Sequence, residues 1–250
     1  MINWLPNQGQ FMNKTIPQSA YTPAKSWQMF DQISNHYDLL NRLLSLGLDK
    51  NWRRELKYYL PEGTDLSLLD LATGTGDVLL TLIKAPSIAT GHGIDLSKNM
   101  LQAAQDKITN TGLRSQLTVS EGDAAQIPFE NGKFDVVTIS FGIRNTESPQ
   151  KVLSEIFRVL KKNGRALILE FSLPANPVLR SLALFYLRTI VPGIGGLISG
   201  NAEAYRYLNR TIEQFPCGES FCDLMQEAGF RIVRFDPLTF GIATIYQGTK

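Results

Sequence analysis

Three aspartates follow short apolar segments of this 250-residue chain, at positions where strands of a parallel sheet would end. Asp70 lies in LLDLA, Asp95 in GIDLS and Asp123 in EGDAA. The carboxyl ends of parallel strands meet at one edge of a sheet, where open α/β sheets bind their ligands. A carboxylate there can accept hydrogen bonds from ribose hydroxyls, and another can hold an adenine amino group. The three acids therefore predict a site for one nucleoside lying across this edge.

A glycine loop, Gly74-Thr75-Gly76, comes between Asp70 and the next predicted helix. Glycine lets the backbone approach a ligand closely, and the N-terminus of the following helix offers unpaired N–H groups. Dinucleotide-binding proteins carry Gly or Ala three residues after the second glycine, where this chain has Leu79. The looser loop after an acidic strand residue favours an S-adenosylmethionine (SAM) enzyme over a nicotinamide enzyme or a protein that binds another nucleotide.

Each aspartate also has a simpler role open to it. Asp70 could cap the loop, Asp95 with Ser97 could begin the next helix, and Asp123 could form a turn. These roles compete with ligand binding at every position. The placement at three successive strand ends favours the nucleoside site.

The elements that would position these residues alternate between short apolar strands and helices from about residue 64 onward, which predicts an α/β fold with parallel strands and crossover helices. The clearest helix is expected at 149–161, because Pro149 suits a first turn and Asn163-Gly164 suits a helix end. The strands are expected at 67–72, 90–95, 117–121, 134–141, 164–171, 231–236 and 241–247.

The length of the chain favours a single large domain over two small ones. We expect a flexible tail at 1–25 and one domain at 26–250. Within the domain, 26–63 would form a helical cap, and 172–216 would be an insertion after the fifth strand that also covers the strand ends. The helix expected at 178–190 could line a tunnel for an apolar substrate tail, rest on an anionic membrane, or simply pack on the sheet.

Composition excludes several classes of protein. A formal net charge of +2 and 19% charged residues do not suggest a nucleic-acid partner. Cys217 and Cys222 match no metal-ligand spacing, so we expect no metal site and a reducing, cytoplasmic location. Residues 1–20 lack the basic start and apolar run of a signal peptide, and no segment reaches the roughly 18 uninterrupted apolar residues of a membrane span.

Two further enzyme classes do not match the motifs. Amino-group methyltransferases of nucleic acids carry an Asn/Asp-Pro-Pro-aromatic motif after the fourth strand, where this chain has SFGIRN. Short-chain reductases need Tyr and Lys four residues apart on a helix after the nucleotide loop. Tyr21 and Lys25 have that spacing, but they precede the loop and enclose Pro23.

Seven segments of the chain resemble, in order, the menaquinone/ubiquinone biosynthesis C-methyltransferase family. The segments are YDLLNRLLSLGLDKNW, LDLATGTGDV, GIDLSKNML, GDAAQIPF, ISFGIRN, RVLKKNGRALILEFS and AYRYLNRTIEQFP, and the resemblance covers about residues 29–250. It implies a class I SAM-dependent methyltransferase fold, Rossmann-like, with a seven-stranded, mostly parallel sheet. One departure is Asp49, which stands where the family usually has histidine.

The resemblance implies SAM contacts at Thr75, Asp95, Asp123, Ala124 and Ser140. The loop and strand arguments add further candidates for cofactor binding, namely Asp70, Gly74 and Gly76.

The implied reaction methylates a ring carbon of a polyprenyl quinol, so a phenolate must be stabilised and a ring proton removed. Arg144 suits the phenolate because its guanidinium is always charged, and Asn145 could bind the second ring oxygen. Tyr37 and Tyr205 are expected to contribute from the cap. The competing role for Arg144 is a structural salt bridge to Glu147 or Glu170.

The expected function is conversion of demethylmenaquinol to menaquinol, with 2-methoxy-6-polyprenyl-1,4-benzoquinol as a second candidate substrate. The alternatives are a small-molecule O- or C-methyltransferase of another pathway, and a SAM-binding scaffold without catalysis. The expected partners are the quinol and the inner membrane surface, with no nucleic acid, and a homodimer is compatible with the sequence. The quinol ring and the tail length stay open.

Overall fold

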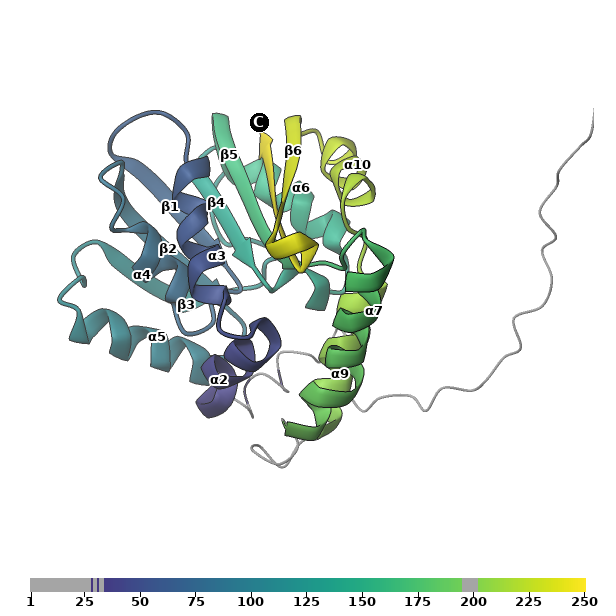
Figure 1. The fold of residues 1–250 in the computed structure, drawn as a ribbon. Helices are drawn as coiled ribbons and strands as arrows, with labels where there is room; N and C mark the ends of the chain where they lie inside the picture. Colours follow the sequence, from purple (N-terminus) through teal and green to yellow (C-terminus); the bar gives the residue numbers. More distant parts are fainter. Residues whose placement is uncertain (1–27, 29–30, 32–33, 195–201) are drawn as a thin grey trace, which may run out of the picture.

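The computed structural model describes residues 28, 31, 34–194 and 202–250, with only the backbone described at 34–38, 40 and 202–204. A seven-stranded sheet of order β3-β2-β1-β4-β5-β7-β6 forms the centre of the molecule (Figure 1). Its strands are β1 Leu66–Leu71, β2 Ile88–Asp95, β3 Leu117–Glu121, β4 Phe134–Ser140, β5 Leu160–Phe171, β6 Arg231–Leu238 and β7 Ala243–Thr249.

The first five strands pair in parallel, and β7 pairs antiparallel with both β5 and β6. The chain runs outward from β1 through β2 to β3, and then returns to β4 on the other side of β1. This reversal opens a crevice at the carboxyl ends of β1 and β4, which is where doubly wound sheets bind ligands. The predicted α/β class, with a mostly parallel sheet of seven strands, is confirmed.

Helices cover both faces of the sheet and its carboxyl edge. Before the sheet come α2 Ser34–Ser45, α3 Asp49–Glu55 and the short 3₁₀ helix η2 Leu56–Tyr59; between strands lie α4 Asp77–Leu82, α5 Lys98–Asn110, the 3₁₀ turn η3 Ile143–Asn145 and α6 Pro149–Val159; after β5 come α7 Pro177–Phe185, the π-helical segment η4 Tyr186–Ile190, α9 Ala202–Gln214, α10 Glu219–Glu227 and the 3₁₀ turn η5 Thr239–Gly241.

Neighbouring strand residues belong to different hydrophobic cores. Leu68 packs in one core with α3, α4 and α9, whereas Leu69 packs in the other with α6 and α10. Val136 and Val137 of β4 divide in the same way, because successive side chains of a strand point to opposite faces. Burial on both faces explains the nearly continuous apolar runs of the central strands.

Several predicted boundaries were wrong by two to four residues. The helix expected to end at 161 ends at Val159, and β5 begins at Leu160 instead of Gly164. Leu160 is extended and fully buried, and it pairs with Phe134 of β4. Pairing with a neighbouring strand therefore overrides the helical pattern at this junction.

The predicted helix at 178–190 changes its winding after α7. Asn209 of α9 donates its side-chain amide to the carbonyl of Leu187, and the backbone is π-helical over Tyr186–Ile190. A side chain that inserts into the hydrogen-bond ladder favours such a widened turn.

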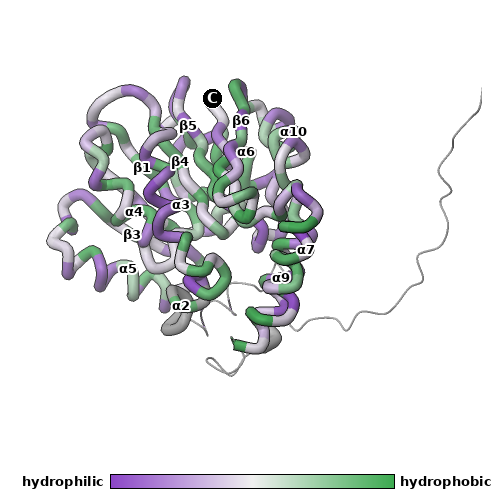
Figure 2. The backbone as a smooth tube through the Cα atoms, viewed as in Figure 1, coloured by the Kyte–Doolittle hydropathy of each residue, from purple (hydrophilic) through white to green (hydrophobic). Residues whose placement is uncertain are grey.

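One side of α7 is apolar and faces away from the protein, and Figure 2 shows hydrophobic residues along this helix. Val178, Leu182 and Phe185 are each at least 60% exposed and follow i, i+4, i+7 spacing. The continuous run Pro177–Ile194 has the length and composition of a membrane span, although it contains two arginines, and only Leu187 and Val191 of it are buried. The described structure thus leaves an unusually apolar helix at the surface.

Candidate active site

A small cavity lies where β1 and β4 end. Arg53, Asp70, Thr73, Asp77 and Ser140 line it, together with Ala72, Thr75 and Val78. The residues come from α3, from β1 and the loop after it, from the start of α4 and from the last position of β4. The crevice expected from the strand order therefore contains polar groups from two strands, two helices and the loop between β1 and α4.

The glycine loop adopts backbone conformations that other residues avoid. Gly74 has φ of 55° and Gly76 has φ of 79°, both in the left-handed region. A Cβ at Gly76 would lie 3.2 Å from the Cβ of Ala104 on α5. Close packing of the loop against α5 thus needs glycine at this position.

Asp95 connects the glycine loop to the next helix. Its carboxylate accepts hydrogen bonds from the backbone N–H groups of Gly74, at 2.8 Å, and Ser97, at 2.9 Å. Ser97 in turn caps α5 by accepting from the N–H of Met100. A carboxylate has about four acceptor sites, so both roles considered for Asp95, helix start and ribose binding, are compatible with this arrangement. Burial raises the pKa of Asp95, and these backbone donors oppose the shift.

Asp70 is buried beneath the loop. Its carboxyl oxygens accept from the hydroxyls of Thr73, at 2.7 Å, and Thr138, at 2.6 Å. Burial raises the pKa of Asp70 to about 7, although the two hydroxyl donors and the nearby Arg53 guanidinium lower it. Asp70 therefore titrates near neutral pH and supports the loop from below.

Asp123 and Ala124 lie at the turn after β3. Asp123 is exposed and accepts from the N–H of Ala125 at 2.8 Å, while Ala124 is buried. The carbonyl of Asp123 also accepts from the N–H of Gln126, so the turn considered from the sequence is present. Because Asp123 keeps acceptor capacity and faces solvent, it can also bind a ligand amino group.

Ser140 and Thr75 contribute hydroxyls to the cavity. The Ser140 Oγ is buried and has no hydrogen-bond partner in the described part of the chain. Buried polar groups nearly always have a partner, so this hydroxyl is suited to bind a ligand in the cavity. Thr75 Oγ1 accepts from Lys107 Nζ at 2.8 Å.

Arg144 lies on η3, directly after the turn that follows β4. Its Nη1 donates to Glu170 at 2.6 Å and to the carbonyl of Phe141 at 2.7 Å, and both charged side chains are at most 2% exposed. Of the two carboxylates considered as partners, Glu170 is the one contacted. Burial raises the pKa of Glu170, and the guanidinium opposes that shift.

The ion pair leaves part of the guanidinium of Arg144 available. Its Nε has no hydrogen-bond partner within the described ranges, and its Cζ lies 5.3 Å from the ring centroid of Phe171. Asn145, next in sequence, donates its side-chain amide to the carbonyl of Phe141 at 3.3 Å. The structure thus positions Arg144 rigidly, as a preorganised donor requires.

The two cap tyrosines have different positions. Tyr205 is buried on α9, in the apolar cluster that includes Trp52 and Phe141, and α9 packs against η3. Tyr37 belongs to α2, but its side chain lies outside the described residues. Of the two, only Tyr205 has a described side chain, and it belongs to the helix that packs against η3.

Sequence reasoning missed Arg53 and the charges around it. Arg42 and Arg53 both form ion pairs with Asp49, which is fully buried. Both arginines also lie within 4 Å of Asp77, at 3.8 and 3.9 Å, and Asp77 binds Lys107 at 2.8 Å. Asp49 thus holds two guanidinium groups beside the cavity. The i, i+4 spacing of Asp49 and Arg53 was the available signal.

These features match the chemistry of SAM. Carboxylates can bind its ribose and adenine, a buried hydroxyl lines the cavity, and the guanidinium of Arg53 can bind the α-carboxylate of its methionine part. In the described part of the chain, no three His, Cys, Asp or Glu side chains are grouped so that they could hold a metal ion.

Solved structures support the fold. The chain is similar to a SAM-dependent methyltransferase of Thermotoga maritima, described as a possible histamine N-methyltransferase, with a TM-score of 0.62 and 20% identity over 90% of this chain and 99% of that one. It is also similar to phosphoethanolamine N-methyltransferase 2 of Haemonchus contortus in complex with SAM, with a TM-score of 0.59 and 18% identity over 78% of this chain and 51% of that one.

Relatives with greater sequence identity are more specific. The chain is 43% identical to the ubiquinone/menaquinone biosynthesis C-methyltransferase UbiE of Citrifermentans bemidjiense, over 89% of this chain and 94% of that protein. It is also 43% identical to the demethylmenaquinone methyltransferase of Thermus thermophilus, over 89% of this chain and all of that protein. The model of the ubiE/COQ5 methyltransferase family matches residues 19–250. The chain belongs to the ubiE/COQ5 methyltransferase family and is a SAM-dependent methyltransferase.

Proposed function

We propose that the chain converts demethylmenaquinol to menaquinol by methylating a ring carbon, and that 2-methoxy-6-polyprenyl-1,4-benzoquinol is a second substrate. The observation that carries the proposal is the 43% identity, over about nine tenths of the chain, to a ubiquinone/menaquinone biosynthesis C-methyltransferase and to a demethylmenaquinone methyltransferase. Arg144 is held by Glu170 and the carbonyl of Phe141 shortly after the carboxyl end of β4, which is consistent with the proposal because this reaction needs a fixed donor for a phenolate.

SAM, when bound, supplies an electrophilic methyl group. Asp95 would hold the ribose, and Asp123 with the neighbouring Ala124 would hold the adenine ring. The backbone of the glycine loop and the Ser140 hydroxyl would bind the methionine part, and Arg53 would bind its carboxylate. Asp70 would act through the loop, since its carboxyl group is engaged by Thr73 and Thr138.

Arg144 would stabilise the phenolate form of the quinol, which increases electron density on the ring carbon. Its guanidinium stays protonated, so it serves as a hydrogen-bond donor and does not remove a proton by itself. Asn145 would bind the second ring oxygen. Tyr205 and Tyr37 would orient the ring or relay the proton from the cap, and Tyr205 is buried in the apolar cluster beside η3.

The quinol tail is apolar, and we assign its approach to the α7 side of the molecule. The exposed Val178, Leu182 and Phe185 are suited to contact the acyl region of a bilayer, with Arg180 able to reach anionic head groups. The protein would then act as a peripheral enzyme at the cytoplasmic face of the membrane. A homodimer stays a prediction that sedimentation would test.

The decisive experiment is incubation of the purified protein with SAM and, separately, each of the two quinols. Mass spectrometry should find a product heavier by one methylene unit, and fragmentation should place the new methyl group on the ring carbon. Asp95→Ala should abolish SAM binding and turnover, whereas Lys151→Gln, at an exposed helix position, should change neither. A protein that binds SAM but methylates neither quinol would favour the scaffold or another small-molecule substrate.

A further inference from the structure

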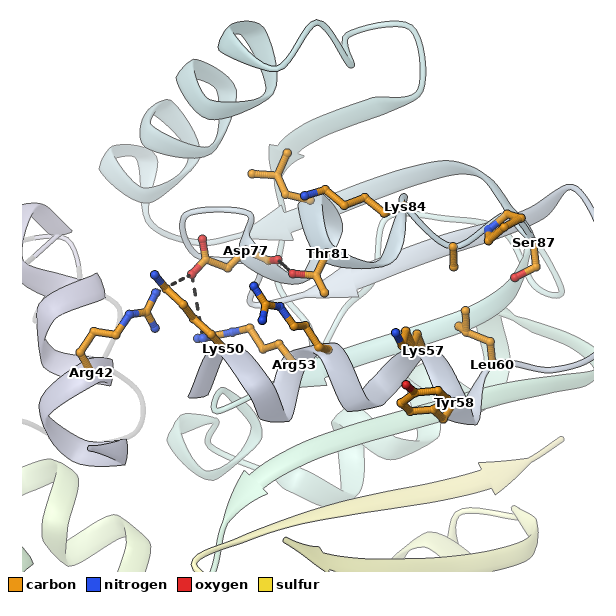
Figure 3. Close-up of a pocket in the computed structure, with 14 residues that line it drawn as sticks. Arg42, Lys50, Arg53, Lys57, Tyr58, Leu60, Asp77, Thr81, Lys84 and Ser87 are labelled. Carbon is orange, nitrogen blue, oxygen red and sulfur yellow. Dashed lines mark hydrogen bonds and ion pairs between the residues drawn. The ribbon is translucent and has the colours of Figure 1, made fainter. Parts of the chain in front are cut away.

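A second, larger cavity runs beside α4, and Arg53 and Asp77 line both it and the small cavity. Its volume is about 770 Å³, and it is open to solvent. Figure 3 shows α3 and η2 along one side, with Lys50, Arg53 and Lys57, and α4 along the other, with Asp77 and Thr81, followed by Lys84 in the turn after α4. We call this cavity the α3–α4 groove.

The α3–α4 groove concentrates positive charge. Its lining includes six cationic side chains and a single carboxylate, that of Asp77, so it carries a formal charge of +5. The whole chain carries only +2, and therefore the remaining residues together carry −3. The six cations are Arg42, Lys50, Arg53, Arg54, Lys57 and Lys84.

The cations of the groove fall into two groups. Arg42 and Arg53 are engaged with Asp49 and belong to the charge network next to the small cavity. Lys50, Arg54, Lys57 and Lys84 are exposed, and none of them has an ion-pair partner in the described part of the chain. The second group is therefore available to an external anion.

The sequence spacing explains how these cations converge. Lys50, Arg54 and Lys57 follow i, i+4, i+7 spacing on one continuous helical segment, so they share one face. Lys84, two residues after the end of α4, and Ser87 also line the groove. Like charges held this close repel each other, so a bound anion would lower the electrostatic energy of the folded protein.

We propose that the α3–α4 groove binds a phosphate-bearing anion, taken either from the head group of an anionic phospholipid or from a soluble phosphate ester. Arg54 can hold two phosphate oxygens through its planar guanidinium, whereas the lysines act as point charges around the group. The two cavities share Arg53 and Asp77, but the four free cations line the α3–α4 groove and not the small cavity, so they lie outside the nucleoside site.

The test uses the full chain and two probes. Calorimetry measures binding of inorganic diphosphate, and sedimentation measures binding to phosphatidylcholine vesicles with and without phosphatidylglycerol. The variant Lys50→Gln/Arg54→Gln/Lys57→Gln removes three charges from the groove. The matched control Lys151→Gln/Lys162→Gln/Arg231→Gln removes three charges from exposed positions outside it. Denaturation curves and SAM affinity verify that both variants are folded.

The wild-type protein should bind at least one probe at low ionic strength. The groove variant should bind it about tenfold more weakly or worse, because three nearby charges are lost, whereas the control should stay within about twofold. If the protein binds diphosphate and not the vesicles, the ligand of the groove is a soluble phosphate ester. If it binds the vesicles that contain phosphatidylglycerol, the ligand is the lipid head group. The proposal is overturned if the wild-type protein binds neither probe, if both variants lose affinity equally, or if the groove variant binds like the wild type.

Discussion

Replacing Arg144 by Met would leave Glu170 buried without its cationic partner. Both side chains of this pair are at most 2% exposed, and the Nη1 to Oε1 distance is 2.6 Å. Removing one partner of such a pair costs about 3–5 kcal/mol, because the remaining charge stays buried. A domain of ordinary stability has about 5–15 kcal/mol in total, so Arg144→Met alone loses activity through unfolding as well as through chemistry.

A double variant separates the two effects. Glu170→Gln removes the second charge and keeps an oxygen that can accept from the backbone N–H of Phe171, as Glu170 does at 2.8 Å. Arg144→Met/Glu170→Gln should therefore recover most of the stability lost in Arg144→Met, since a buried ion pair contributes little net stability compared with neutral replacements. Urea denaturation of the four proteins measures the recovery. A double variant as unstable as Arg144→Met would refute the ion-pair argument.

Turnover of the stable double variant then tests the role of Arg144 in the reaction. If the guanidinium stabilises the phenolate, turnover should fall by about 10²–10³-fold while SAM affinity stays close to that of the wild type. Glu170→Gln alone, which keeps Arg144, should lose far less turnover. Near wild-type turnover in the double variant would show that Arg144 serves only the fold.

Three further outcomes follow from the site and the surface. Because the pKa of Asp70 is raised to about 7, the Asp70 carboxyl group binds its proton more tightly in the folded protein than in the unfolded chain. The free energy of unfolding of the wild type, measured by urea denaturation relative to that of Asp70→Asn, should therefore fall by up to about 4 kcal/mol from pH 4 to pH 7. A difference that does not change with pH would contradict this. Gly76→Ala should lower the free energy of unfolding by about 1–2 kcal/mol and weaken SAM binding measured by calorimetry. Gly112→Ala, at a similar φ of 73° with no atom within 4 Å of an added Cβ, should lower the stability without changing SAM affinity. Replacing Val178, Leu182 and Phe185 together by serine should reduce vesicle binding without changing SAM affinity, and unchanged vesicle binding would remove α7 from the membrane contact.

The fold could be predicted from local patterns because the sheet is made of short, continuous apolar runs. All seven strands were expected close to their observed places, and the antiparallel β7 was the part that periodicity alone could not orient. Boundaries such as Val159–Leu160 were missed, since a pairing partner 26 residues earlier, Phe134, determines where the strand begins. Such pairing is nonlocal, and no helical or strand period encodes it.

The nucleoside candidates were also visible in the sequence, because each is attached to a strand end or a glycine turn. The carboxylate of Asp95 accepts a hydrogen bond from the N–H of Gly74 at 2.8 Å, although the two residues are 21 positions apart, because β1 and β2 are neighbours in the sheet. From the sequence, two acids, Glu147 and Glu170, were candidate partners of Arg144. The pairing of β4 with β5 places Glu170 beside it.

By itself, the sequence determined the carboxyl ends of the parallel strands and the glycine loop, since these depend on residues close together along the chain, and it determined the family through motifs that recur in order. Only the tertiary structure decided that Asp49 forms ion pairs with both Arg42 and Arg53. It also decided that six cationic side chains line one groove, in a chain whose net charge is only +2. Net charge is a sum over the chain, whereas binding depends on where the charges lie in space. Packing of α3 against α4 brings these cations together.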